Sequence, residues 1–336
     1  MGITSKEFGV LTNGTAATLY SITNKNGYVL DVSDYGAIWV GTKVPTVTGI
    51  TDVILGFDDV TGYEEDGAHL GATVGRNANR IKEGKYTLEG KSYTLAINNS
   101  GNNLHSGLNY WGKRMWSATV SEDKNAVTFS LESADMEQGY PGNMNISVTY
   151  TLTDDNTVSL SYEATSDTTT LCNPTNHVYF NLNGHSNSTI WNHKLWIDSS
   201  AITETENDVC TGVLLPVAGT EYDFTTEKPV EVALDTNFCT DPHHTATAPR
   251  ITCTGELSGI KMSVATDMPG IQVYTANFLD NPNGKAHTAY TPASGICFES
   301  QHYVNGINID SPDFKKPILK ALETFNSTTL YHFELV

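Results

Sequence analysis

A glutamate stands in the middle of a segment that has the pattern of a buried strand. In SGICFESQHY, residues 294–303, Ile296 and Phe298 alternate with Cys297 and Glu299. Successive side chains of a strand point to opposite faces, so we expect Ile296 and Phe298 in a core and Glu299 on the other face. An unpaired carboxylate among half-buried neighbours costs several kcal/mol or raises its pKa. Two explanations stay open: an outward-facing position, or a general base at the floor of a cleft.

A histidine occupies a comparable position in LCNPTNHVYFNLNG, residues 171–184. Alternation predicts that His177 and Tyr179 share one face, while the apolar Val178 and Phe180 share the other. A histidine that only fills a core would be expected on the apolar face. His177 is therefore a candidate for acid–base chemistry.

Two arginines flank an Asn-Ala-Asn segment in LGATVGRNANRIKEG. Arg76 and Arg80 could make surface ion pairs. Alternatively, Arg80 follows Asn79 and precedes the core-type Ile81, so its planar fork could be fixed for contact with the oxygens of a diol.

Further polar groups lie beside glycine, proline or apolar runs. His105 stands among Asn and Gly residues, with Trp111 and Trp116 downstream. This density of amides and aromatic rings is typical of a carbohydrate-binding surface. Asp235 follows the apolar run Val-Ala-Leu, and Gln272 comes just after a Pro-Gly pair.

Motifs for other chemistries are absent or incomplete. The chain has no GxSxG, HExxH or CxxC motif, and GLNYWGKR lacks the Ser/Thr that a P-loop needs. The adjacent His243 and His244 are interpreted as a solvated loop, since neighbouring side chains point apart and no partner has ligand spacing. The remaining candidate histidines lie in separate motifs and the five cysteines are scattered, so the sequence predicts no metal and no cofactor.

The remaining candidates fit one reaction type. A carboxylate and a histidine on opposite sides of the anomeric centre of a sugar supply a proton acceptor and a proton donor. That pair suffices for acid–base ring opening without a covalent intermediate.

The sequence resembles the aldose 1-epimerase (galactose mutarotase) family over essentially its whole length. The stretches that carry the resemblance are GATVGRNANRI, NNLHSG, GYPGNMNISVTYTLTDDNTVSLSYEAT, TNHVYFNL, LDTNF, MPGIQVYT and CFESQHYVNGIN. The resemblance implies a β-sandwich with an open sugar-binding cleft, and the interconversion of the α- and β-anomers of free aldohexoses such as glucose and galactose.

The resemblance also implies roles for particular residues. Glu299 matches the general base, His177 the general acid, and His105 the second histidine near the ring oxygen. The positions that match residues holding the sugar hydroxyls are Arg80, Asn79, Asp235 and Gln272. The chain departs from the family pattern after His105, where Ser106-Gly107 replaces Gly-Gly, and after Glu299, where SQHYVN replaces a segment with a Pro-Asp pair. These departures concern the rim of the cleft.

Composition narrows the possible partners. The net charge is −19, with 19 Lys+Arg against 38 Asp+Glu, which makes nucleic acid and anionic membrane surfaces poor partners. The chain has few arginines, which disfavours a hexose-6-phosphate 1-epimerase: Arg76, Arg80, Arg114 and Arg250. A non-catalytic sugar-binding protein is the third alternative, and the presence of both Glu299 and His177 argues against it.

The elements that must position these residues are almost all strands. Alternation and turn residues predict hairpins, most clearly over MNISVTYTLTDDNTVSLSYEAT. Helical patterns are limited to short segments near 5–8, 58–63 and 312–319. We expect one all-β domain over residues 1–336, a large antiparallel β-sandwich. Scattered cysteines and an N-terminus without an apolar signal segment predict a cytoplasmic protein. A monomer or weak homodimer is expected.

Overall fold

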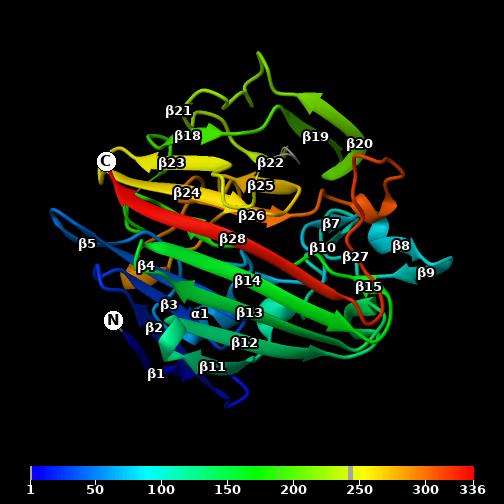
Figure 1. Cartoon of the computed structure of the whole chain (residues 1–336), viewed down its shortest axis with the longest axis horizontal. Coiled ribbons are helices and arrows are strands. Elements are labelled where there is room, and N and C mark those ends of the chain that lie inside the picture. Colours follow the sequence, from blue (N-terminus) through cyan, green and yellow to red (C-terminus); the bar gives the residue numbers. More distant parts are fainter. Residues whose placement is uncertain (1, 188, 241–244) are drawn as a thin grey trace.

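The computed structural model describes residues 2–187, 189–240 and 245–336 (Figure 1). Antiparallel strands make up most of it, in sheets of nine, six and five strands with smaller two-stranded sheets beside them. The expected all-β class is confirmed. No helix in these ranges has the length and apolar character needed to cross a membrane.

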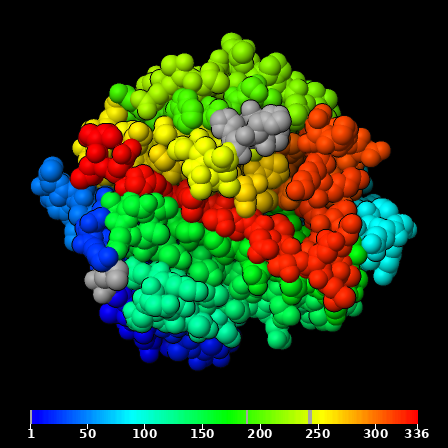
Figure 2. Space-filling model, in the orientation of Figure 1, coloured from blue at the N-terminus to red at the C-terminus, as the bar shows by residue number. Residues whose placement is uncertain are grey.

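The nine-stranded sheet crosses the middle of the molecule in Figure 1. In spatial order its strands are β11 (Ser117–Ser121), β12 (Ala126–Ser133), β13 (Met144–Leu152), β14 (Thr157–Ser166), β28 (Thr324–Leu335), β24 (Ile260–Thr266), β23 (Ile251–Gly255), β18 (Lys194–Ile197) and β21 (Lys228–Pro229). Figure 2 shows the C-terminal strand in red between the green β13–β14 segment and the yellow β23–β24 segment. The last strand of the chain therefore joins the two halves of the sheet.

The predicted hairpin 144–165 is confirmed as β13 and β14. Met144 pairs with Ser166 and Leu152 with Val158, and side chains along β13 alternate between buried and more exposed. The turn contains Asn156 with φ 67°, a left-handed conformation that asparagine adopts more readily than most residues. Local alternation and turn chemistry are sufficient to specify this element.

The six-stranded sheet carries the functional residues described below. Its order is β17 (Tyr179–Phe180), β26 (Ile296–Gln301), β25 (Gly270–Tyr274), β22 (Asp235–Cys239), β19 (Ala201–Glu206) and β20 (Val209–Pro216). The five-stranded sheet runs in chain order: β1 (Gly2–Val10), β2 (Ala16–Thr23), β3 (Val29–Ser33), β4 (Ile38–Thr46) and β5 (Gly49–Asp52).

Short strand pairs and turns complete the chain. The two-stranded sheets are β6 (Thr73–Val74) with β16 (Thr175–Asn176), β7 (Arg80–Ile81) with β10 (Asn103–Leu104), β8 (Lys85–Leu88) with β9 (Lys91–Thr94), and β15 (Thr170–Leu171) with β27 (Ile318–Leu319). Single 3-10 turns are η1 (Lys82–Gly84), η2 (Trp111–Lys113), η3 (Glu122–Lys124), η4 (Glu137–Gly139), η5 (Lys285–His287) and η6 (Gly306–Asn308).

The main core lies between the nine-stranded sheet and the other two large sheets. Trp39 of β4 is fully buried there and meets the rings of Tyr150, Phe180 and Tyr331 edge-on, at centroid distances of 6.2, 5.6 and 5.0 Å. These partners come from β13, β17 and β28, so one indole links strands of all three sheets. Such edge-to-face contacts add about 0.5–1.5 kcal/mol each beyond the burial of area.

The helix predictions are confirmed in one of three places. The segment near 58–63 becomes α1 (Val60–Glu65), where Asp59 accepts a hydrogen bond from the Thr61 N–H as an N-cap. Residues 5–8 instead lie within β1, paired along β2, and 312–319 forms a turn followed by β27. Both helix predictions are wrong because segments of four and eight residues hardly offset the cost of helix nucleation, whereas a neighbouring strand supplies hydrogen bonds to β1 and β27.

Candidate active site

Three adjacent strands of the six-stranded sheet bring the predicted acidic and amide residues together. Glu299 of β26 pairs with Gln272 of β25, and Asp235 begins the next strand, β22. Ile296 and Phe298 enter the main core, as alternation predicted. Glu299 is 2% exposed and faces a cavity rather than the apolar core.

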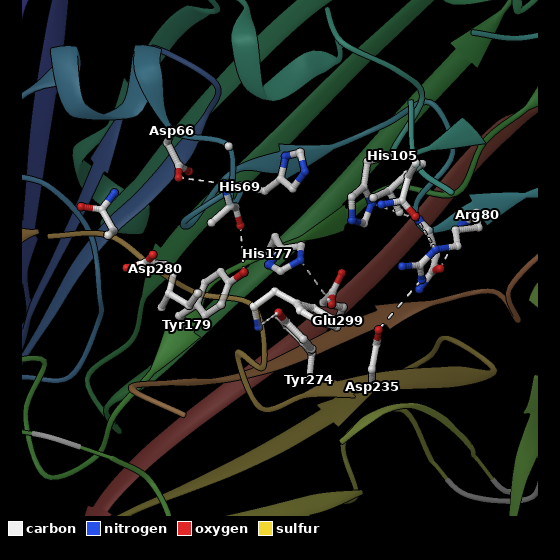
Figure 3. A pocket seen from close by; sticks show the side chains of 18 residues that line it. Asp66, His69, Arg80, His105, His177, Tyr179, Asp235, Tyr274, Asp280 and Glu299 are labelled. Atoms are coloured by element: carbon white, nitrogen blue, oxygen red, sulfur yellow. Dashed lines mark hydrogen bonds and ion pairs between the residues drawn. The ribbon is translucent and has the colours of Figure 1, made fainter. Parts of the chain in front are cut away.

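This cavity has a volume of about 340 Å³. The predicted residues that line it are Asn79, Arg80, His105, His177, Asp235 and Glu299. Gln272 is not among the residues that line the cavity; its Nε2 donates a hydrogen bond to the Asp235 Oδ1, at 2.6 Å. Figure 3 shows Arg80 and Asp235 on one side of Glu299, and His177 on the other.

His177 is held by its backbone and by ring contacts. Its N–H donates to the Ala72 carbonyl and its own carbonyl accepts from the Gly71 N–H, which ties the residue to the segment after α1. Its ring stacks on Tyr179 with centroids 5.0 Å apart, and its Nδ1 lies 3.6 Å from the Cys297 Sγ. These contacts leave Nε2 directed at Glu299, with 3.7 Å between Nε2 and Oε1.

His105 has a defined tautomer. The ring Nδ1 of His105 accepts a hydrogen bond from the backbone N–H of Asn79 at 3.1 Å, and the backbone N–H of His105 donates to the Asn79 carbonyl. A neutral imidazole that accepts at Nδ1 must carry its hydrogen on Nε2. His105 therefore acts as a hydrogen-bond donor. Both residues have positive φ, 50° for His105 and 59° for Asn79, so this close approach depends on two left-handed backbone positions.

Burial shifts the proton affinities of Glu299 and His177 in opposite directions. It raises the pKa of Glu299 well above the ordinary value, with Asp235 adding to the rise and Arg80 opposing it. Burial also lowers the pKa of His177 to about 4. The Glu299 Oε2 has no hydrogen-bond partner among the described residues, so this oxygen is available to accept a hydrogen bond from a substrate hydroxyl.

Arg80 is positioned for a ligand as well as for its neighbours. Its Nε donates to the Asn99 Oδ1 at 3.0 Å, and its Nη1 lies 4.0 Å from the Asp235 Oδ2. Asn99 was not predicted, since nothing distinguishes it from the other asparagines of its loop. The Arg80 guanidinium and the Asp235 carboxylate together offer hydrogen-bond donors and acceptors to adjacent hydroxyl groups of a ligand in the cavity.

Arg76 has a structural role and makes no surface ion pair. It is 2% exposed, and its guanidinium donates to four backbone carbonyls, those of Ser133, Ala134, Pro141 and Gly142. The suggestion of a surface ion pair for Arg76 is therefore wrong. Its charge is dispersed over carbonyl oxygens that would otherwise be buried without a donor.

The aromatic residues downstream of His105 do not form a sugar-binding surface. Trp111 and Trp116 are 2% and 4% exposed and belong to the main core. Trp111 packs over Gly75, where a Cβ would lie 2.0 Å from the indole Cε3. That part of the interpretation is wrong. The aromatic rings that line the cavity are instead Tyr179, Tyr274 and Phe278.

His69 is a cavity residue that sequence analysis missed. Its ring lies 4.9 Å from that of His105 and 5.7 Å from that of His177, measured between centroids. The local sequence Ala-His-Leu-Gly has no alternation or motif that would have singled it out.

Histidines from separate sequence motifs meet in the cavity, so their separation in sequence does not by itself exclude a ligand set. His105, His177 and Glu299 offer ligand atoms within 4.8 Å of one another, close enough to consider a metal ion. The hydrogen bonding of His105 argues against one, because its Nδ1 is occupied by the Asn79 N–H and its Nε2 then carries a hydrogen. The other proposed histidine pair, His243 and His244, lies outside the described residues.

Comparison with known proteins identifies the family of this chain. A family model described as aldose 1-epimerase matches residues 18–332. This chain belongs to the aldose 1-epimerase family. Galactose mutarotase of Sus scrofa is 36% identical over 349 residues, covering 100% of this chain and 99% of the relative. Aldose 1-epimerase of Escherichia coli (strain K12) is 32% identical, with 96% of each chain covered.

Solved structures of aldose 1-epimerase relatives have the same fold. The structure of an aldose epimerase homologue from C. elegans matches with a TM-score of 0.89 at 31% identity, covering 95% of this chain and 99% of that one. Galactose 1-epimerase from Lactobacillus acidophilus matches with a TM-score of 0.83 at 22% identity, covering 99% and 98%. The resemblance noted from the sequence is confirmed, and with it the β-sandwich fold.

Proposed function

We propose that this protein is an aldose 1-epimerase, an isomerase that interconverts the α- and β-anomers of free aldohexoses such as glucose and galactose. The observation that carries the proposal is the pair formed by Glu299 and His177, which face each other across 3.7 Å in a cavity where burial raises the pKa of Glu299 and lowers that of His177. The family relationship supports the same reaction.

The reaction transfers one proton at each of two oxygens. Glu299 accepts the proton of the C1 hydroxyl while the His177 Nε2–H protonates the ring oxygen, and the C1–O5 bond breaks. The open-chain aldehyde rotates about C1–C2, and the ring oxygen attacks the other face of C1. Glu299 then returns its proton to the C1 oxygen and His177 recovers the proton of the ring oxygen.

The environment of the pair suits this exchange. The pair passes from a charged carboxylate and imidazolium to a neutral acid and a neutral imidazole, so its net charge does not change. In water the charged arrangement would be favoured by about 2 pKa units. Burial raises the pKa of Glu299 and lowers that of His177, so the preference for the charged arrangement is lost in the folded protein.

The remaining residues hold the sugar. The His105 Nε2–H can donate to the ring oxygen, where it stabilises the developing charge without adding a second acid. Arg80, Asp235 and Asn79 face the secondary hydroxyls, and Gln272 orients the Asp235 carboxylate through its hydrogen bond. Asp235 and Arg80 also exert opposite effects on the pKa of Glu299, so sugar binding and proton transfer share the same residues.

A phosphorylated substrate is not favoured. Among the described residues Arg80 is the arginine that lines the cavity, and the carboxylates of Asp66 and Asp280 line it too. Asp235 and Glu299 bring further negative charge. A phosphate at C6 would meet like charges with few cations to compensate them.

Polarimetry tests the proposal directly. Freshly dissolved α-galactose or α-glucose should reach its equilibrium rotation faster with the protein than in buffer, and the same sugar carrying a 6-phosphate should show little acceleration. A rate no higher than in buffer for every free aldose would refute the activity. Faster turnover of the 6-phosphate would favour the phosphate-specific alternative.

A further inference from the structure

His69 lies in the cavity but has no part in the proton transfers described above. It follows α1 in a short segment that the Asp66 carboxylate fixes by accepting hydrogen bonds from the N–H groups of Ala68 and Leu70, at 2.8 and 2.7 Å. The His69 carbonyl accepts from the Ala72 N–H. The residue is therefore held from both flanks, with a left-handed φ of 61°.

The side chain of His69 is anchored at one nitrogen only. Its Nδ1 lies 2.8 Å from the Tyr110 hydroxyl, and the rings of the two residues meet edge-on. Tyr110 is 2% exposed, and burial raises its pKa well above the ordinary value, so this partner is a neutral hydroxyl. No partner for the Nε2 of His69 is found among the described residues, and the residue lines the cavity.

The position of His69 relative to the catalytic pair decides which part of the sugar it would meet. Figure 3 shows the His69 ring beside His105 and His177, on the opposite side of Glu299 from Arg80 and Asp235. With O1 at Glu299 and the ring oxygen at the histidines, C2 and its hydroxyl extend toward Arg80 and Asp235. The carbon on the other side of the ring oxygen is C5, which carries the C6 hydroxymethyl group.

We propose that His69 is a specificity-determining residue whose Nε2 hydrogen-bonds the C6 hydroxyl of an aldohexose. This inference rests on the proposed function and names the substrate class more closely: aldohexoses with a free C6 hydroxyl. Either tautomer of His69 can make the bond, since a hydroxyl both donates and accepts.

The charge state of His69 agrees with a neutral ligand. Burial, with smaller contributions from nearby His177 and Lys113, lowers its pKa to about 3, so the imidazole is uncharged at neutral pH. An uncharged imidazole binds a hydroxyl but does not compensate a phosphate. Lys113 offers no alternative, because its Nζ donates to the backbone carbonyls of Tyr63, Glu64 and Asp66.

The assignment is tested by measuring the kcat/KM of two sugars with the wild type and with a His69 variant. Galactose and 6-deoxygalactose differ only in the C6 hydroxyl, and His69→Phe keeps an aromatic ring against His105 and His177 while removing both nitrogens. For the wild type we expect kcat/KM to be about three- to tenfold higher for galactose, the range for one neutral hydrogen bond. In the variant this ratio should fall to about one.

A second His69 variant and a control variant distinguish a lost hydrogen bond from a folding defect. His69→Asn has a side chain too short to reach the sugar, yet asparagine tolerates the left-handed backbone, and it should lose the same preference. His332→Phe serves as the control, since His332 lies in the nine-stranded sheet with its Nδ1 3.2 Å from the Thr157 Oγ1. It should keep the wild-type ratio.

Three results would overturn the assignment of His69. The wild type could treat both sugars alike, or both His69 variants could slow both sugars by the same factor, or the control could lose the preference as well. If 6-deoxygalactose turns over too slowly to follow, its inhibition constant against galactose replaces kcat/KM in the same comparison. A wild type that accelerates neither galactose nor glucose refutes the proposed function itself, which is a separate result.

Discussion

Replacing Glu299 by glutamine is expected to make the protein more stable at neutral pH while removing its activity. The Glu299 side chain is buried, its Oε2 has no partner among the described residues, and its Oε1 is 3.7 Å from the His177 Nε2, beyond hydrogen-bond distance. Glutamine has nearly the same shape but carries no charge into this site. The substitution therefore tests the base without emptying the cavity.

The pH dependence of the stability difference follows from the direction of the pKa shift. The pKa of Glu299 is raised in the folded protein above its ordinary value of 4.5, so ionising the side chain disfavours the folded state. That cost is absent below the unfolded-state pKa and grows as the pH rises toward the folded-state pKa. A buried polar group without a partner costs about 1–3 kcal/mol, so we expect a gain of that size for the variant at about pH 8 and almost none at about pH 4.

Urea unfolding at both pH values measures the gain in the free energy of unfolding. The matched control is Glu163→Gln on the exposed side of β14, for which we expect no comparable gain. Polarimetry measures the activity, which should fall by about 10²–10⁴-fold or more while the sugar affinity is nearly kept. Retention of more than about a tenth of the rate would remove Glu299 from the role of base. A variant that is less stable at about pH 8, or equally more stable at both pH values, would refute the reasoning on burial.

Other substitutions and conditions test the rest of the site. Arg80→Ala should chiefly raise KM, because a group that holds hydroxyls acts in the ground and transition states alike; an unchanged KM would disprove its role. The pH–rate profile should be bell-shaped, because the active form of the Glu299–His177 pair carries one proton. Activity should fall at low pH, where the pair gains a second proton and the pKa of His177 is lowered to about 4, and at high pH, where Glu299 with its raised pKa loses the remaining proton. A profile without an alkaline limb would contradict the assignment. Activity should survive dialysis against EDTA, and a rate that drops to the buffer level and returns with a divalent metal would refute the metal-free mechanism. Arg76→Met should lower the free energy of unfolding by about 3–5 kcal/mol, since several carbonyls lose their donor, and a midpoint in urea close to that of the wild type would contradict this.

Local sequence determined the class of fold and the orientation of the two catalytic candidates. Alternation of period two is a property of a strand by itself, so the hairpin of β13 and β14 could be predicted before any partner strand was known. The same rule separated Phe298 from Glu299 and Val178 from His177, and the structure has the apolar members in the main core. The family motifs added the roles, which composition and periodicity do not contain.

Long-range packing decided everything that depends on distance between segments. Asp235 and Glu299 meet in one cavity because β26, β25 and β22 are neighbours in a sheet whose order differs from that of the chain. The three histidines lie outside these strands, and backbone hydrogen bonds between distant segments bring them to the same cavity. No local pattern contains that order. The separation of the histidines in sequence is likewise unrelated to the distance between their rings.

The same reason accounts for the residues that were misassigned. Arg76 and Arg80 are four positions apart and have similar neighbours in sequence, yet Arg76 binds buried carbonyls while Arg80 lines the cavity. The tryptophans after His105 face the core because Gly75, from another segment, leaves room for Trp111. The sequence alone determined which side chains are available and to which side of a strand they point; only the tertiary structure decided which of them share a site, because burial, hydrogen bonding and pKa depend on neighbours that distant segments supply.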